Sequence, residues 1–124
     1  MTITTFWIPI VLVVSPRVDF LQHTPIFSSG ELEVHLLATD SAAITACREK
    51  PHVRIVVVDH ALAGWENLLH ELRVGWPYLT VILFSATEIS SSWKTQMRHK
   101  FSNVGPVLSP GGTPLSEVVK FFAT

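Results

Sequence analysis

Five short apolar runs, separated by segments of helical pattern, constrain the fold of this chain more than any other feature of its sequence. In chain order they cover residues 10–14, 33–37, 54–58, 80–84 and 105–108. The first, third and fourth are almost unbroken Val, Ile and Leu, which is typical of parallel strands covered on both faces. The second contains Glu33 and His35, and the fifth contains Pro106, which cannot donate a hydrogen bond to a neighbouring strand. We therefore expect the second and fifth runs to form the edge strands.

The segments that follow these runs carry the periodicity of amphipathic helices. The predicted helices cover residues 41–50, 65–74, 90–102 and 115–123, and Thr39 or Asp40 can cap the first of them. The connection over residues 17–30 is less regular, because Pro25 removes a backbone amide. The order is thus strand and helix repeated five times. Right-handed crossovers turn this order into an α/β fold, a three-layer doubly wound (βα)5 flavodoxin-like sandwich with a five-stranded parallel sheet.

Length and composition are consistent with a single domain over residues 1–124. The formal net charge is −1, so there is no broad basic field to attract nucleic acid. The apolar run from Phe6 to Val14 is far shorter than the ~20 residues that a membrane-spanning helix needs. The one cysteine, Cys47, excludes an intrachain disulfide and fits a reducing compartment. We expect a cytoplasmic protein that binds neither nucleic acid nor a membrane, with Cys47 in its core.

In a doubly wound sheet, functional residues follow the carboxyl ends of the strands. Those positions hold Ser15 and Pro16, Asp59, Ser85 and Ser109. Together with the runs that precede them, they resemble the receiver domains of response regulators over nearly the whole chain. Residues 56–64, for example, are similar to the third strand, the phosphoacceptor and the following turn of that family. The resemblance implies that Asp59 is the phosphoacceptor equivalent and that Ser85 is equivalent to the hydroxyl residue that reports phosphorylation.

The resemblance also implies chemistry that this sequence lacks. Active receivers hold Mg²⁺ with two acidic residues after the first strand, and they pair the phosphoryl group with a lysine after the fifth. This chain has Ser15 and Pro16 at the acidic-pair positions and Ser109 at the lysine position. A neutral hydroxyl is a weak ligand for a hard cation, and the phosphoryl group would lack a fixed counter-charge. The sequence therefore predicts a pseudo-receiver without a metal site, in which Asp59 marks the scaffold but is not phosphorylated in the usual way.

The favoured function is a phosphorylation-independent adaptor in a two-component or related regulatory pathway. The family signals through its fourth helix, fifth strand and fifth helix, a face that here carries Lys94, Arg98, Lys100 and Lys120. A partner at this face would be a kinase, an output domain or a second copy of the chain in a homodimer. Two alternatives stay open: a conventional receiver phosphorylated on Asp59 that controls an output domain, and a flavodoxin-like domain that binds a small molecule. We find no nucleophile and base that argue for an enzyme, and we expect no cofactor.

Three further residues bear on the region around Asp59. The histidines show no metal-ligand spacing, and we expect His60 to be a solvated loop residue. Trp93 belongs to an apolar helical stripe and is expected in the core. Trp65 follows Gly64 on the functional rim, where we expect a partly exposed ring that favours a protein interface.

Overall fold

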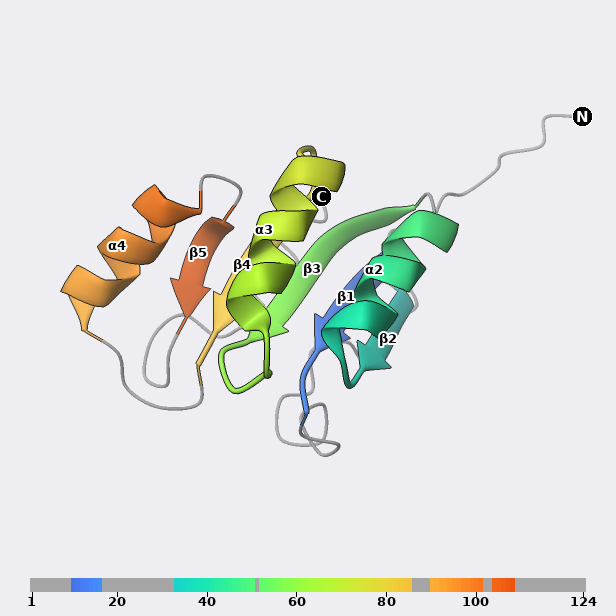
Figure 1. Cartoon of the computed structure of the whole chain (residues 1–124), viewed down its shortest axis with the longest axis horizontal. Helices are drawn as coiled ribbons and strands as arrows, with labels where there is room; N and C mark the ends of the chain where they lie inside the picture. Colours follow the sequence, from blue (N-terminus) through green and yellow to red (C-terminus); the bar gives the residue numbers. More distant parts are fainter. Residues whose placement is uncertain (1–9, 17–32, 51, 86–89, 102–103, 109–124) are drawn as a thin grey trace, which may run out of the picture.

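The computed structural model describes residues 10–16, 33–50, 52–85, 90–101 and 104–108. Its parallel sheet has five strands in the order β2-β1-β3-β4-β5 (Figure 1). The strands are β1 (Ile10–Val14), β2 (Glu33–Leu37), β3 (Val53–Asp59), β4 (Thr80–Phe84) and β5 (Val104–Leu108). Three helices connect successive strands: α2 (Asp40–Glu49), α3 (Trp65–Gly75) and α4 (Ser91–Lys100).

The strand order reverses beside β1. Strand β2 lies on one side of β1, and β3, β4 and β5 follow outward on the other side. This is the doubly wound, flavodoxin-like arrangement that the sequence predicts, and β2 and β5 occupy the edges as expected. The carboxyl ends of β1 and β3 meet where the order reverses, which is the place where such sheets gather their functional residues.

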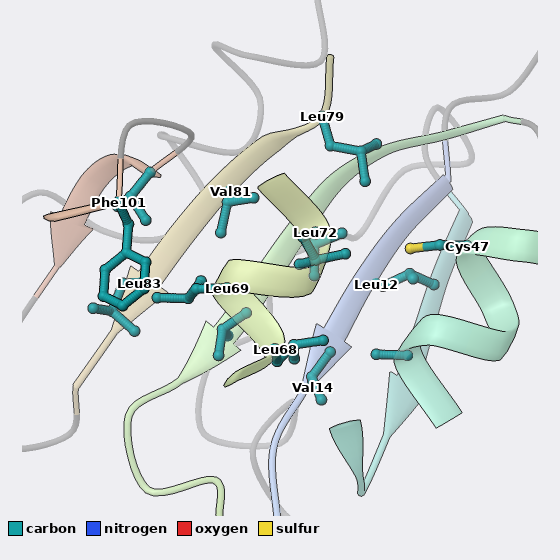
Figure 2. Packing of buried hydrophobic residues seen from close by; sticks show 14 of the residues in the cluster. Leu12, Val14, Cys47, Leu68, Leu69, Leu72, Leu79, Val81, Leu83 and Phe101 are labelled. Carbon is teal, nitrogen blue, oxygen red and sulfur yellow. The ribbon is translucent and has the colours of Figure 1, made fainter. Parts of the chain in front are cut away.

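Both faces of the central strands are buried, which explains their unbroken apolar sequences. One face packs against the three helices, and Figure 2 shows Leu12, Val14, Val81 and Leu83 beside leucines of α3. The opposite face carries a second buried cluster: Val11, Val13, Ile55, Val57, Ile82 and Leu108. Successive strand residues point to opposite faces, so alternate residues of β1 and β3 enter the two clusters. The sheet therefore holds the carboxyl ends of β1 and β3 in fixed positions.

The helix starts follow the capping rules. Thr39 caps α2, since its hydroxyl accepts a hydrogen bond from the Ala42 amide at 3.1 Å, as predicted. Ser90 caps α4 in the same way, by accepting from the Trp93 amide at 3.1 Å. Helix α3 instead follows Gly64, whose φ of +79° is a left-handed conformation that favours glycine. A Cβ atom there would also lie 3.1 Å from Oδ2 of Asp40.

The predicted boundaries agree with the observed ones to within two residues for every described element. Strand β3 is one residue longer at each end than the predicted 54–58, so Asp59 is its last residue. The predicted helix over 115–123 and the connection over 17–30 lie outside the described residues. Among the helices described here, none is long and apolar enough to cross a membrane.

Candidate functional site

Asp59 lies at the point where the strand order reverses. It ends β3 and is only 2% exposed. In the sheet register, Val58 lies opposite Val14 of β1, and Asp59 lies opposite Phe84 of β4. Ser15 comes directly after Val14, so the register places Ser15 and Asp59 at neighbouring positions. The sequence analysis placed both residues at the carboxyl ends of strands, and the structure brings them into contact.

The hydroxyl of Ser15 donates a hydrogen bond to the Asp59 carboxylate. The distance from Ser15 Oγ to Asp59 Oδ2 is 2.7 Å, and Ser15 is also 2% exposed. The other carboxylate oxygen, Oδ1, accepts from the backbone amide of Ala61 at 2.9 Å. A short O–H···O bond to a carboxylate is among the stronger hydrogen bonds in proteins. The protein itself therefore supplies donors to both oxygens of Asp59.

The turn after Asp59 is fixed by backbone hydrogen bonds. The Leu62 amide donates to the Asp59 carbonyl at 2.9 Å, and the His60 amide donates to the Phe84 carbonyl at 2.7 Å. The side chain of Leu62 is buried in the core that faces the helices. The carboxylate of Asp59 and the turn that follows it thus form one hydrogen-bonded unit anchored to β4.

The other predicted site residues separate into three groups. Ser85 is buried just after Phe84, and its amide donates to the Leu108 carbonyl at 2.9 Å, so it stands at the carboxyl end of β4 beside β5. Pro16 is exposed. Ser109 lies outside the described residues. The structure therefore gathers Ser15, Asp59 and Ser85 at the carboxyl end of the sheet.

The Mg²⁺ ion of active receivers does not fit the donors found here. Across the described ranges, no group of three or more His, Cys, Asp or Glu side chains could hold a metal. Mg²⁺ prefers carboxylate oxygens in octahedral geometry, but the neighbour of Asp59 on β1 is a hydroxyl that donates to the carboxylate. At this end of the sheet, Ser15 thus presents a hydrogen-bond donor to the Asp59 carboxylate.

A cluster of aromatic rings follows Asp59, and the sequence did not predict it. The expectation that His60 is a solvated loop residue is wrong: its half-buried ring lies 4.9 Å from the Trp65 ring and 5.0 Å from the Trp93 ring, between centroids. Trp93, expected in the core, packs against it but stays partly exposed. Trp65 is partly exposed, as predicted. Two tryptophans near the starts of α3 and α4 were the available signal, but their sequence positions do not reveal that His60 lies between them.

The predicted partner face is only partly free. Lys94 and Arg98 lie on α4 with no salt bridge to any described residue, and Arg98 is exposed. Lys100, in contrast, forms an ion pair with Glu66 of α3 at 2.8 Å. Lys120 lies outside the described residues. A pocket of about 360 Å³ beside α4 is lined by Thr95, Arg98, His99 and Val104, so this side of the molecule is polar and basic.

Cys47 is buried in α2, as expected. Burial raises the pKa of its thiol to about 11, because desolvation disfavours the thiolate. The thiol is therefore protonated and unreactive at neutral pH.

Comparison with known proteins identifies the fold. No family model matches the sequence, and no curated protein matches it. Among solved structures, the signal receiver domain of a Luxo repressor protein from Vibrio parahaemolyticus is similar with a TM-score of 0.77 and 17% identity, over 93% of this chain and 89% of that one. A CheY-like response regulator receiver domain protein from Methanospirillum hungatei has a TM-score of 0.71 and 16% identity, over 92% of this chain and 90% of that one.

A pilus assembly-related protein from Burkholderia pseudomallei is similar over 99% of this chain and 95% of its own, with a TM-score of 0.71 and 20% identity. Identities this low show a common fold and not a common activity. The chain therefore has the fold that these response-regulator receiver domains share.

Proposed function

We propose that this chain is a receiver-fold signalling domain that acts by binding a protein partner and is not phosphorylated through the usual Mg²⁺-dependent route. The observation that carries the proposal is the buried hydrogen bond from Ser15 to Asp59. It puts a hydroxyl donor where an active receiver needs a carboxylate for its metal. Such a domain would act in the cytoplasm and would need no cofactor or enzymatic activity of its own.

The physical basis is the charge balance of phosphoryl transfer. The transition state carries negative charge on the transferred group, and metal ions and fixed cations neutralise it. Within the described residues, Asp59 belongs to no group of three or more His, Cys, Asp or Glu side chains that could hold a metal. A dianionic phosphoryl group on Asp59 would also displace the Ser15 hydroxyl from its 2.7 Å contact. Both effects favour the unmodified carboxylate.

A partner surface on α4 is consistent with this proposal. Lys94 and Arg98 form no salt bridge with a described residue, and α4 itself contains no Asp or Glu. Basic side chains beside a polar pocket suit an acidic surface on a kinase, on an output domain or on a second copy of this chain.

Phosphorylation is tested with acetyl phosphate and Mg²⁺, followed by intact-mass measurement of the full chain. We expect no stoichiometric gain of a phosphoryl group in the natural sequence. A matched variant restores the family chemistry by Ser15→Asp, Pro16→Asp and Ser109→Lys, and it should gain one phosphoryl group under the same conditions. The same variant with Asp59→Asn identifies the modified residue.

Stoichiometric phosphorylation of the natural chain that Asp59→Asn abolishes would contradict the proposal. That result would favour the alternative of a conventional receiver controlling an output domain. Saturable stabilisation by a small molecule in a thermal-shift screen, lost with Ser15→Ala, would instead favour a flavodoxin-like binding domain.

The partner surface is tested by reversing two charges on α4. We expect Lys94→Glu with Arg98→Glu to weaken self-association or partner retention by at least tenfold, because the complementary charges then repel. The measurements are molar mass by light scattering and retention of the chain's partner on an affinity resin. The matched control is Arg48→Glu with Arg73→Glu, which reverses two exposed charges in the last turns of α2 and α3. Equal behaviour of the two double variants would exclude α4 as the contact surface.

A further inference from the structure

Helix α4 is joined to the Asp59 turn by three rings. The His60 ring packs against the ring of Trp65, the first residue of α3, and against that of Trp93, in the first turn of α4. The two indoles are 6.0 Å apart, and all three pairs are tilted or edge-on, with interplanar angles of 52° to 77°. Aromatic rings at these distances and angles attract one another beyond the area they bury. The cluster thus connects the segment after β3 to the beginning of α4.

The C-terminal end of α4 also contacts the first turn of α3. Nζ of Lys100, the last residue of α4, lies 2.8 Å from Oε2 of Glu66 and 5.4 Å from the Phe101 ring. The Phe101 ring in turn lies 6.2 Å from that of Trp65. Trp65 and Glu66 are adjacent in the first turn of α3. Contacts from the start and from the end of α4 therefore converge on two neighbouring residues.

These contacts matter because the rest of α4 is weakly anchored. Met97 is the only residue within this helix that the structure buries, and seven of its other residues are exposed to solvent. A helix with so little buried apolar surface gains little from the hydrophobic effect alone. Side chains near its two ends must therefore supply a large share of the free energy that holds it in place.

His60 also follows Asp59 directly. The His60 amide is bonded to Phe84 of β4, and the next amide, that of Ala61, is bonded to Oδ1 of Asp59. The imidazole is consequently held by a backbone segment that the sheet and the Asp59 carboxylate both fix. The hydrogen-bonded turn after Asp59 is thus linked through the His60 ring to Trp93 in the first turn of α4.

We propose that His60, Trp65 and Trp93, together with the Glu66–Lys100 ion pair, form a clamp that holds α4 in one position against α3 and the turn after Asp59. His60 is its central positioning residue. The clamp fixes the position of α4 without any modification of the chain. This inference goes beyond the proposed function and does not depend on it, because it requires neither a partner nor a phosphoryl donor.

Hydrogen–deuterium exchange of the full chain, without partner or phosphoryl donor, tests the clamp. His60→Ala removes two ring contacts, so the amides of α4 should exchange roughly tenfold faster while those of α3 change less than twofold. His60→Phe keeps an aromatic ring and should stay within twofold of the natural chain. The control is His70→Ala, which removes an exposed histidine of α3 and should leave α4 unchanged.

Three results would overturn the clamp. The first is α4 exchange within twofold of the natural chain in His60→Ala. The second is an equal increase in α3 and α4, which would mean a general loss of stability. The third is a His60→Phe variant as fast as His60→Ala, which would show that the ring contacts are not the cause. Phosphorylation of Asp59 would contradict the proposed function without affecting any of these measurements.

Discussion

Helices α3 and α4 cover the same face of the sheet but are held there differently. Helix α3 buries three leucines completely, Leu68, Leu69 and Leu72, and they point into the core between the sheet and the helices (Figure 2). Helix α4, near the β5 edge (Figure 1), buries Met97 and otherwise depends on contacts at its ends. The core is therefore thickest over β1 and β3, where Asp59 is held, and thinnest near the β5 edge.

This difference separates the two parts of the proposed function. The Asp59 region is rigid because hydrogen bonds and complete burial fix its carboxylate. The α4 region exposes basic side chains on a helix whose removal from the sheet would cost little apolar burial. Helix α4 can therefore shift when a partner binds without disturbing the sheet, and the ring cluster limits the size of that shift.

The largest expected effect on stability comes from truncating a buried leucine of α3. Leu69→Ala leaves a cavity in a fully buried site and should lower the free energy of unfolding by about 3 kcal/mol. The matched change in α4, Met97→Ala, should cost about 2 kcal/mol or less, since water can reach the space it leaves at the thinner edge of the core. Urea unfolding of both variants gives the two values.

If Met97→Ala lowers the free energy of unfolding as much as Leu69→Ala does, α3 and α4 are not anchored differently. The slope of the unfolding free energy with urea must also agree between the variants, because a changed slope would signal a different denatured state. In that case the two free energies could not be compared directly.

Most of the described fold could be predicted from the sequence. The unbroken Val and Ile of β1 and β3 require burial on both faces, and Pro106 and Glu33 indicate edge positions. Thr39 identifies the start of α2 through its capping hydroxyl. These signals are local, so they can be read along the chain. The predicted strand order of a doubly wound sheet then follows from right-handed connections.

The site was only partly predictable, because its important contacts join distant segments. The strand ends indicated that Ser15 and Asp59 meet, since parallel strands bring their carboxyl ends together. That the hydroxyl donates to Oδ2 depends on side-chain geometry, which no spacing reveals. His60 was wrongly expected in solvent, because its ring packs against Trp65 and also against Trp93, which is 33 positions further along the chain. Likewise, the ion pair of Lys100 with Glu66 joins two different helices, which the position of Lys100 in the sequence does not indicate.

The smallest expected effect tests whether the charged end of α4 adds to its attachment. Glu66→Gln removes the ion pair with Lys100, whose partners are 53% and 56% exposed, so the loss of stability should be only ~0.3 kcal/mol at low salt. Salt screens exposed charges, so the difference from the natural chain should vanish near 1 M salt. The control is Glu71→Gln on the same helix, where the carboxylate accepts from the neutral amide of Asn67 at 3.3 Å. Thermal unfolding at both salt concentrations measures the effect.

A loss above about 1 kcal/mol that persists in high salt would contradict this expectation. The ion pair would then contribute more to the clamp on α4 than an exposed pair normally does, and the contrast with α3 would be smaller than the burial of the two helices indicates.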